Sequence, residues 1–231
     1  MRVTTIGFDA DDTLWENEAF FRLTQERFRD LLADHAEAER LSERLLAAER
    51  RNLGHYGYGI KGFVLSMVET AIEVTEGRVP AEVIGRILAH GREMLRHPVE
   101  LRPGAADCVG RLAGTHRLVL ITKGDLLDQE RKLAGSGLAP LFDAVEIVSD
   151  KVAATYARAF AAHGDGPDRA LMVGNSMRSD VVPAIEAGAW GVHCPSEIEW
   201  ALEAAPAPED APRFRRIASL DALPGLVAEL G

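Results

Sequence analysis

Short apolar runs alternate with helical stretches along much of the chain, and this alternation restricts the fold more than any other feature. The apolar runs that we expect to be strands cover residues 2–8, 117–122, 142–148, 169–174 and 190–194. The stretches that we expect to be helices follow the later runs and cover residues 125–137, 152–164, 179–188 and 197–205. Strands separated by single helices are typical of a parallel sheet covered by helices on both faces. The sequence therefore predicts an α/β fold with a doubly wound parallel sheet.

A long segment after the first expected strand does not follow this pattern. From residue 18 to residue 96, apolar residues recur at helical spacing over about four stretches, and no strand pattern is present. The glycine-rich break HYGYGIKG at residues 55–62 divides this segment in two. We therefore expect a core made of residues 1–14 and 98–231, with an all-helical domain inserted over residues 15–97.

Charge and hydropathy argue against two classes of partner. The formal net charge is -10, whereas surfaces that bind a nucleic-acid backbone are usually basic. No segment approaches the ~20 apolar residues that a membrane-spanning helix needs, and the first residues, MRVTTIGF, do not form a basic leader. We expect a cytoplasmic protein, monomeric or homodimeric, that binds neither nucleic acid nor membrane.

Polar residues follow four of the expected strands at their carboxyl ends, where parallel sheets bind their ligands. They are Asp9, Asp11 and Asp12; then Thr122, Lys123, Gly124 and Asp125; then Ser149, Asp150 and Lys151; and then Gly174, Asn175, Ser176 and Asp180. A single Asp or Ser at such a place is often only a helix cap. Acids, a hydroxyl, a lysine and a further acid in this order are much harder to explain by capping alone.

These four segments resemble the motifs of one enzyme family. FDADDT (8–13), LVLITKG (118–124), SDK (149–151) and GNSMRSD (174–180) match in order the four motifs of the haloacid dehalogenase-like (HAD) hydrolase superfamily. The resemblance implies a Rossmann-like core. It also implies that the helical insertion is a C1 cap, which supplies substrate specificity in this family.

The resemblance implies a phosphatase that uses two carboxylates. Asp9 corresponds to the nucleophile, which attacks phosphorus to form an aspartyl-phosphate. Asp11 corresponds to the general acid and base, which protonates the leaving alcohol and then takes a proton from water. Because residues i and i+2 of an extended segment share a side, both carboxyl groups can face one phosphorus atom. Asp12, where many relatives have Gly, is expected to support the loop.

The same resemblance implies a cofactor and substrate contacts. Acidic side chains and a phosphate dianion cannot share a pocket without a cation, and Mg²⁺ prefers oxygen ligands. The expected metal ligands are Asp9, Asp11, Asn175 and Asp180. Lys151 is expected to contact the nucleophile and the phosphoryl oxygens. The expected substrate contacts are Thr122, Lys123 and Gly124 at the second motif and Lys61 in the insertion. The expected substrate is a small phosphorylated metabolite.

Two alternatives remain open on the residues. Asn175 stands where the phosphatase motif has its first Asp, and metal-independent 2-haloacid dehalogenases of the family carry an Asn in this region. Asp11 favours the phosphatase, because displacement of a halide leaves no alcohol to protonate. A phosphorylated signalling module of the receiver type also combines acids, a hydroxyl, a lysine and Mg²⁺. Such a module is about half this length and carries its phosphorylated Asp after a later strand.

Overall fold

The computed structural model describes residues 2–230, and these form two compact units. We call Met1–Glu18, Val99–Lys123 and Gln129–Gly231 the core unit. We call Ala19–Pro98 with Gly124–Asp128 the helical unit. No helix in the described part of the chain is long and apolar enough to cross a membrane.

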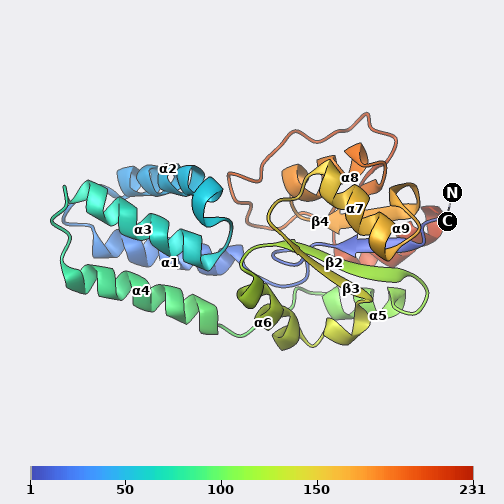
Figure 1. The fold of residues 1–231 in the computed structure, drawn as a ribbon, viewed down its shortest axis with the longest axis horizontal. Helices are drawn as coiled ribbons and strands as arrows, with labels where there is room; N and C mark the ends of the chain where they lie inside the picture. Colours follow the sequence, from blue (N-terminus) through green and yellow to red (C-terminus); the bar gives the residue numbers. More distant parts are fainter. Residues whose placement is uncertain (1, 231) are drawn as a thin grey trace. The chain divides into compact units, whose positions relative to one another are not determined.

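A six-stranded sheet forms the centre of the core unit (Figure 1). Its strands are β1 (Thr5–Phe8), β2 (Arg117–Lys123), β3 (Ala144–Val148), β4 (Ala170–Gly174), β5 (Trp190–His193) and β6 (Phe214–Arg216). They lie in the order β3-β2-β1-β4-β5-β6, and every neighbouring pair is parallel. The order reverses at β1, which is the arrangement of a doubly wound, Rossmann-like sheet. The predicted fold class is confirmed.

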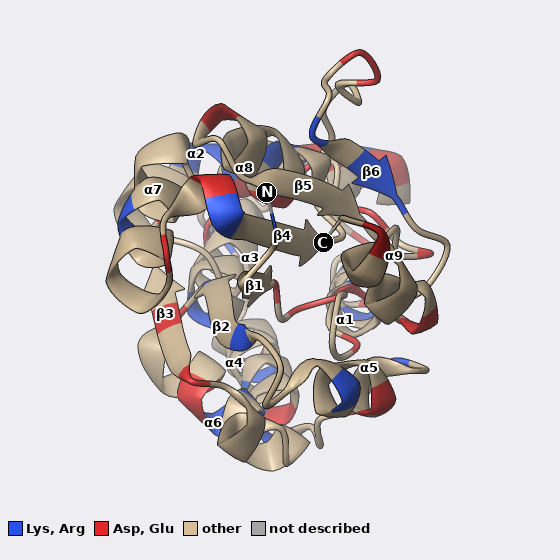
Figure 2. Ribbon diagram, turned by 90° about the vertical axis from the view of Figure 1, so that its right-hand side faces the viewer, with Lys and Arg blue, Asp and Glu red and all other residues tan. Residues whose placement is uncertain are grey.

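Both faces of the sheet are covered because the strands are apolar on both sides. Along β2, Leu118 and Leu120 belong to one buried cluster, while Val119 and Ile121 belong to another. The first cluster includes residues of α5 (Ala105–Leu112), α6 (Leu126–Ser136) and α9 (Leu223–Leu230); the second includes residues of α7 (Ala153–His163) and α8 (Val182–Glu186). Figure 2 shows α7 and α8 on one side of the sheet and α5 and α9 on the other.

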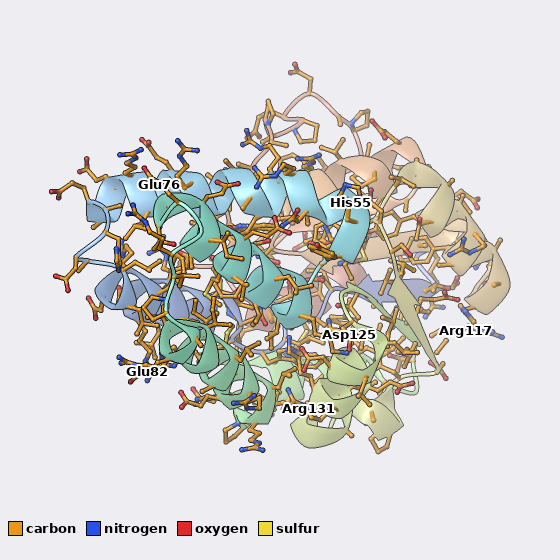
Figure 3. All side chains as sticks on the ribbon, turned by 60° about the vertical axis from the view of Figure 1, so that its left-hand side comes forward. His55, Glu76, Glu82, Arg117, Asp125 and Arg131 are labelled. Carbon is orange, nitrogen blue, oxygen red and sulfur yellow. The ribbon has the colours of Figure 1, made fainter. Side chains whose placement is uncertain are left out.

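Four helices make up most of the helical unit, as the periodicity predicts. They are α1 (Glu18–Leu31), α2 (Ala38–Tyr56), α3 (Ile60–Val74) and α4 (Ala81–Arg96). Figure 3 shows His55 in the last turn of α2 and Glu82 in the first turn of α4. The four helices have their own buried cluster, which includes Phe28, Leu45 and Met67. This unit therefore buries an apolar centre without using the sheet.

Short helical turns complete the core unit. Three are 3-10 turns, Ala139–Leu141, Pro167–Arg169 and Leu220–Ala222, and one is a π-helical turn, Met177–Val181. The π-helical turn directly precedes α8. It carries Asp180, one of the predicted site residues.

One predicted helix is wrong. Residues 197–205 are not helical, and they belong to an irregular connection between β5 and β6. The carbonyl oxygen of Leu202 accepts a hydrogen bond from the Arg178 side chain at 2.9 Å, and the Glu203 side chain reaches three polar groups of the sheet edge. These tertiary contacts override the helical propensity of EWALEAA.

The insertion leaves and re-enters the core unit at adjoining points. Trp15 forms isolated β-bridges with Asp11 and with Leu101. The Glu16 amide donates to the Glu100 carbonyl oxygen at 2.9 Å. The Asp12 carboxylate then accepts the amide N–H groups of Asn17 and Glu18 at 3.0–3.1 Å, where α1 begins.

Candidate active site

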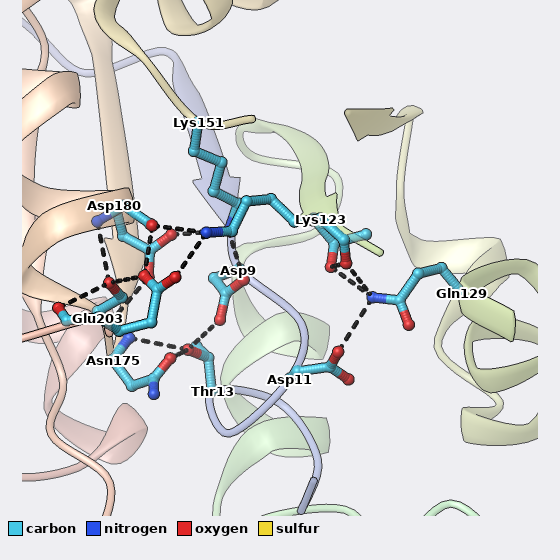
Figure 4. Close-up of polar contacts among 12 residues, drawn as sticks. Asp9, Asp11, Thr13, Lys123, Gln129, Lys151, Asn175, Asp180 and Glu203 are labelled. Carbon is cyan, nitrogen blue, oxygen red and sulfur yellow. Dashed lines mark hydrogen bonds and ion pairs between the residues drawn. The ribbon is translucent and has the colours of Figure 1, made fainter. Parts of the chain in front are cut away.

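β1 delivers Asp9 to the middle of the sheet edge, between the ends of β2 and β4. The Asp9 amide donates to the Val173 carbonyl oxygen of β4 at 2.9 Å, which continues the strand pairing to this residue. Lys151 Nζ lies 2.5 Å from Asp9 Oδ1 and 2.7 Å from Asp180 Oδ1 (Figure 4). All three side chains are buried. One ammonium group therefore bridges two carboxylates from different strand ends.

The protonation of this group follows from its burial. Burial and, to a lesser extent, the charge of Asp180 raise the pKa of Asp9 to about 7, although Lys151 and Thr13 act in the opposite direction. Burial alone would lower the pKa of Lys151, but Asp180 and Asp9 outweigh it and hold that pKa above its ordinary value. The lysine is therefore charged, and the two carboxylates share a single positive charge.

Thr13 and Asn175 extend the group on the other side of Asp9. Thr13 Oγ1 donates to Asp9 Oδ2 at 2.8 Å and lies 3.2 Å from the side-chain oxygen Oδ1 of Asn175. It also accepts a hydrogen bond from the backbone N–H of Asn175 at 3.0 Å. Thr13 is not among the site residues that the sequence predicts. The sequence indicates Thr13 only as the last residue of the motif FDADDT, at residues 8–13.

The oxygens at this place fit a hard divalent cation. The buried carboxylates of Asp9 and Asp180 share one ammonium group, which leaves an excess of negative charge, and the Asn175 amide oxygen lies 3.2 Å from the Thr13 hydroxyl that binds Asp9. Oxygen ligands with excess negative charge are what Mg²⁺ prefers. Within residues 2–230, however, no cluster of three or more His, Cys, Asp or Glu side chains is placed to hold a metal ion. Such a site would depend on the Asn175 amide and on oxygens from outside the chain.

The Asp11 carboxylate points to a second group of residues (Figure 4). Asp11 Oδ1 accepts from Trp15 Nε1 at 2.7 Å and from Lys132 Nζ at 2.9 Å, and Oδ2 accepts from Gln129 Nε2 at 3.2 Å. These contacts hold the carboxylate in one orientation. They also turn it away from the oxygens that would bind the metal, so its side chain is not among the ligands that the structure brings together.

Thr122 is joined to the second group through the same glutamine. The buried Gln129 amide donates to Thr122 Oγ1 at 2.6 Å and to the Lys123 carbonyl oxygen at 2.9 Å. Because Thr122 Oγ1 accepts a hydrogen bond from Gln129, the hydroxyl proton of Thr122 points to another group. Its acceptor is the Lys123 carbonyl oxygen, 3.3 Å away. This hydroxyl can donate to a closer acceptor.

Lys123 lies in a partly buried ion pair. Its Nζ donates to Ser179 Oγ at 2.8 Å and to Glu203 Oε1 at 2.6 Å. Burial alone would raise the pKa of Glu203, but the charge and hydrogen bond of Lys123, with hydrogen bonds from Ser176 and Ser179, outweigh burial and lower that pKa. Glu203 is therefore a carboxylate. Glu203 is not among the predicted site residues, and it lies in the predicted helix 197–205 that the structure does not contain.

Two predicted substrate contacts belong to the helical unit. Lys61 forms an ion pair with Asp125 at 2.9 Å, and both side chains are partly exposed. Gly124 has a φ of 130°, in the region that favours glycine. Contact of either residue with a substrate stays a prediction.

A comparison with protein families identifies the chain. The model for haloacid dehalogenase-like hydrolases matches residues 3–188. The chain belongs to the haloacid dehalogenase-like hydrolase family. Its segments 8–13, 118–124, 149–151 and 174–180 all lie inside the matched part.

Solved structures agree with this family assignment. A haloacid dehalogenase-like family hydrolase from Xanthomonas campestris is 42% identical, with a TM-score of 0.87, over 99% of this chain and 91% of that chain. The magnesium-bound HAD hydrolase YfnB from Bacillus subtilis is 18% identical, with a TM-score of 0.69, over 98% and 99%. The L-2-haloacid dehalogenase from Xanthobacter autotrophicus, with chloropropionic acid covalently bound, is 19% identical, with a TM-score of 0.67, over 99% and 100%. The last two show the fold alone. A comparison with curated protein sequences finds no match.

Proposed function

We propose that this HAD hydrolase is a Mg²⁺-dependent phosphatase of small phosphorylated metabolites in the cytoplasm, with Asp9 as its nucleophile. The observation that carries the proposal is the Asp11 carboxylate, which stands two residues after Asp9 and is held in place by three side chains. Hydrolysis of an ester needs a proton donor for its leaving alcohol, and displacement of a halide does not. In this proposal residues 1–14 and 98–231 form the catalytic core, and residues 15–97 form a cap that selects the substrate.

The first step transfers the phosphoryl group to the protein. A carboxylate oxygen of Asp9 attacks phosphorus, a bond forms between them, and the bond from phosphorus to the ester oxygen breaks. Asp11 gives its proton to that oxygen, so that a neutral alcohol leaves. Lys151 keeps Asp9 oriented and adds positive charge near the phosphoryl oxygens, and the Thr122 hydroxyl donates to one of them.

The second step restores the carboxylate. Asp11, now without its proton, accepts one from a water molecule as the water oxygen attacks phosphorus. The bond from phosphorus to Asp9 breaks, and inorganic phosphate leaves. Asp9, Asn175 and Asp180 would hold the Mg²⁺, which supplies positive charge to the phosphoryl oxygens.

One observation favours a second function. Asn175 brings no charge to the oxygens beside Asp9, and its side-chain oxygen lies 3.2 Å from Thr13 Oγ1. A metal-independent 2-haloacid dehalogenase would use Asp9 to attack carbon and release a halide. The signalling module is not retained, because the family model identifies the chain as a hydrolase.

The two functions are separated by their need for metal. The protein is freed of metal with EDTA and then assayed on a panel of phosphomonoesters with and without Mg²⁺, and on 2-chloropropionate without metal. We expect phosphate release that is lost with EDTA and restored by Mg²⁺, and no chloride release. Phosphate release that survives EDTA undiminished, or chloride release from the metal-free protein, would contradict the proposal.

A further inference from the structure

Glu203 reaches the candidate active site from the irregular connection between β5 and β6. Its carboxylate accepts hydrogen bonds from Ser176 Oγ at 2.5 Å, from Ser179 Oγ, and from Lys123 Nζ at 2.6 Å (Figure 4). The side chains of Glu203 and Lys123 are only 15% and 11% exposed. Three hydrogen bonds to a charged group are strong, so they fix the orientation of the Glu203 carboxylate and also the positions of the three donor groups.

The two serines determine the shape of the turn that carries Asp180. Ser176 Oγ accepts the Ser179 amide N–H at 2.9 Å, and the Ser176 amide donates to Asp180 Oδ2 at 3.0 Å. Glu203 binds both hydroxyl groups from outside the turn. The position of Asp180 therefore depends on Glu203 through a short chain of hydrogen bonds.

The ion pair also connects two strand ends on either side of the nucleophile. Lys123 is the last residue of β2, the serines follow β4, and β1 lies between these strands. The Lys123 carbonyl oxygen accepts from Gln129, which also contacts Thr122 and Asp11. Glu203 thus links the two groups of side chains that surround the end of β1.

We propose that Glu203 is a positioning residue, which fixes Asp180 and the end of β2 relative to Asp9. Lys123 is its counter-charge rather than a ligand of the substrate. The role of Glu203 rests on the proposed function only for the measurements of activity. The hydrogen bonds that it makes do not depend on which reaction the protein catalyses. Residues that orient metal ligands from behind typically change metal affinity about 10- to 100-fold when they are replaced.

A set of variants separates positioning from simple stabilisation. Glu203→Gln removes the carboxylate that accepts from Lys123, and Lys123→Met removes the ammonium group that donates to Glu203. Replacing both residues by Met removes the two partly buried charges together, a change that is often neutral or favourable for stability when an ion pair is buried. Glu199→Gln is the matched control, because Glu199 is an exposed acid of the same connection. Ser179→Ala is a milder variant that removes one donor to Glu203 and keeps the ion pair.

Two measurements are made on each variant. The first is hydrogen exchange of residues 176–181 in the metal-free protein. The second is the Mg²⁺ concentration that gives half of the maximal rate, with kcat and KM for a phosphomonoester. In Glu203→Gln we expect faster hydrogen exchange of residues 176–181. We also expect about 10-fold more Mg²⁺ to be needed for half of the maximal rate, with a lower kcat and little change in KM. The double Met variant should regain thermal stability and keep the fast exchange. Ser179→Ala should shift exchange and Mg²⁺ need in the same direction by less, and Glu199→Gln should match the wild type.

The outcomes separate this inference from the proposed function. Wild-type exchange in both Glu203→Gln and Ser179→Ala would overturn the inference, whatever the activity shows. A large change in KM for Lys123→Met, with the Mg²⁺ need unchanged, would overturn it by assigning Lys123 to the substrate. If the wild type shows no Mg²⁺-dependent phosphate release, the proposed function fails, and the exchange measurement still decides on Glu203.

Discussion

At the scale of single residues, three hydrogen-bond donors determine the orientation of the Asp11 carboxylate. A tryptophan N–H, a lysine ammonium and a glutamine amide, from Trp15, Lys132 and Gln129, all donate to one carboxylate. Such a set fixes orientation, which general acid catalysis requires, and it leaves the chemistry of Asp11 distinct from that of the bridged Asp9. The two carboxylates should therefore differ in their response to the leaving group.

We predict that Asp11→Asn slows the release of alkyl alcohols about 100-fold or more. The loss should be much smaller with p-nitrophenyl phosphate, because p-nitrophenolate leaves without a proton. Steady-state kcat on both kinds of ester tests this. Asp12→Asn is the control, since Asp12 accepts amide N–H groups at the start of α1 and should show no dependence on the leaving group. Equal losses on both esters for Asp11→Asn would argue against a general acid at this position.

The residues that could be found from the sequence share one property. Asp9 and Asn175 directly follow strands and Thr122 is the second-last residue of one, so the chain order alone predicts that they meet at one edge. Gln129 and Glu203 come from the middle of a helix and of an irregular connection, and their roles depend on tertiary contacts that no local pattern encodes. Lys132 had a weak signal, because the chain has only four lysines.

At the scale of elements, the end of β4 and the turn after it approach unusually closely. A Cβ atom at Gly174 would lie 2.2 Å from Asp180 Oδ2 and 2.3 Å from its carboxyl carbon. Real Cβ atoms essentially never come closer than 3.0 Å to such atoms. Glycine at the last position of β4 is therefore required for the Asp180 carboxylate to lie beneath the sheet edge and meet Lys151.

We predict that Gly174→Ala moves Asp180 away from Lys151, with a loss of about 3 kcal/mol in stability, because a buried ion pair is disrupted, and a loss of most activity. Gly110→Ala in α5 is the matched control. Nothing lies within 4 Å of a Cβ there, so the change should be neutral or stabilising by about 0.5–1 kcal/mol. Urea unfolding and phosphatase assays of both variants test this. Unchanged stability and activity in Gly174→Ala would contradict it.

The connection between β5 and β6 shows why part of the fold could not be predicted. Its sequence EWALEAA favours a helix, but the tertiary contacts of Arg178 and Glu203 outweigh this local preference. Strands buried on both faces, such as β2 and β4, left no comparable ambiguity, since their apolar runs fit only the interior of a sheet. Local patterns thus predicted the layers, and side-chain contacts determined the connection.

At the scale of the whole molecule, the helical unit contains a buried acid that should make stability depend on pH. Burial raises the pKa of Glu49 from 4.5 to about 7. In the unfolded chain this acid loses its proton near pH 4.5, whereas the folded protein retains it up to about pH 7. The folded state therefore binds more protons between these values, and the free energy of unfolding falls as the pH rises through them.

We predict that Glu49 lowers the free energy of unfolding by about 3 kcal/mol between pH 4.5 and pH 8. The Glu49→Gln variant should lack this decrease and should be the more stable protein at pH 8. Glu43→Gln is the control, because Glu43 is exposed on the same helix. Urea unfolding followed by circular dichroism at several pH values measures the difference. Parallel pH profiles for the wild type and Glu49→Gln would contradict the prediction.

The bridge between Trp15 and Leu101 has a consequence for how such a protein can evolve. The inserted segment starts and ends at neighbouring positions. Replacing it with a longer segment therefore mainly adds a free-energy cost for closing the loop, about 0.6 kcal/mol for each doubling of length. The register of β1 and the start of α5 need not change. One contiguous stretch of coding sequence can therefore be exchanged by recombination while the strands that position Asp9 and Asp180 are inherited intact.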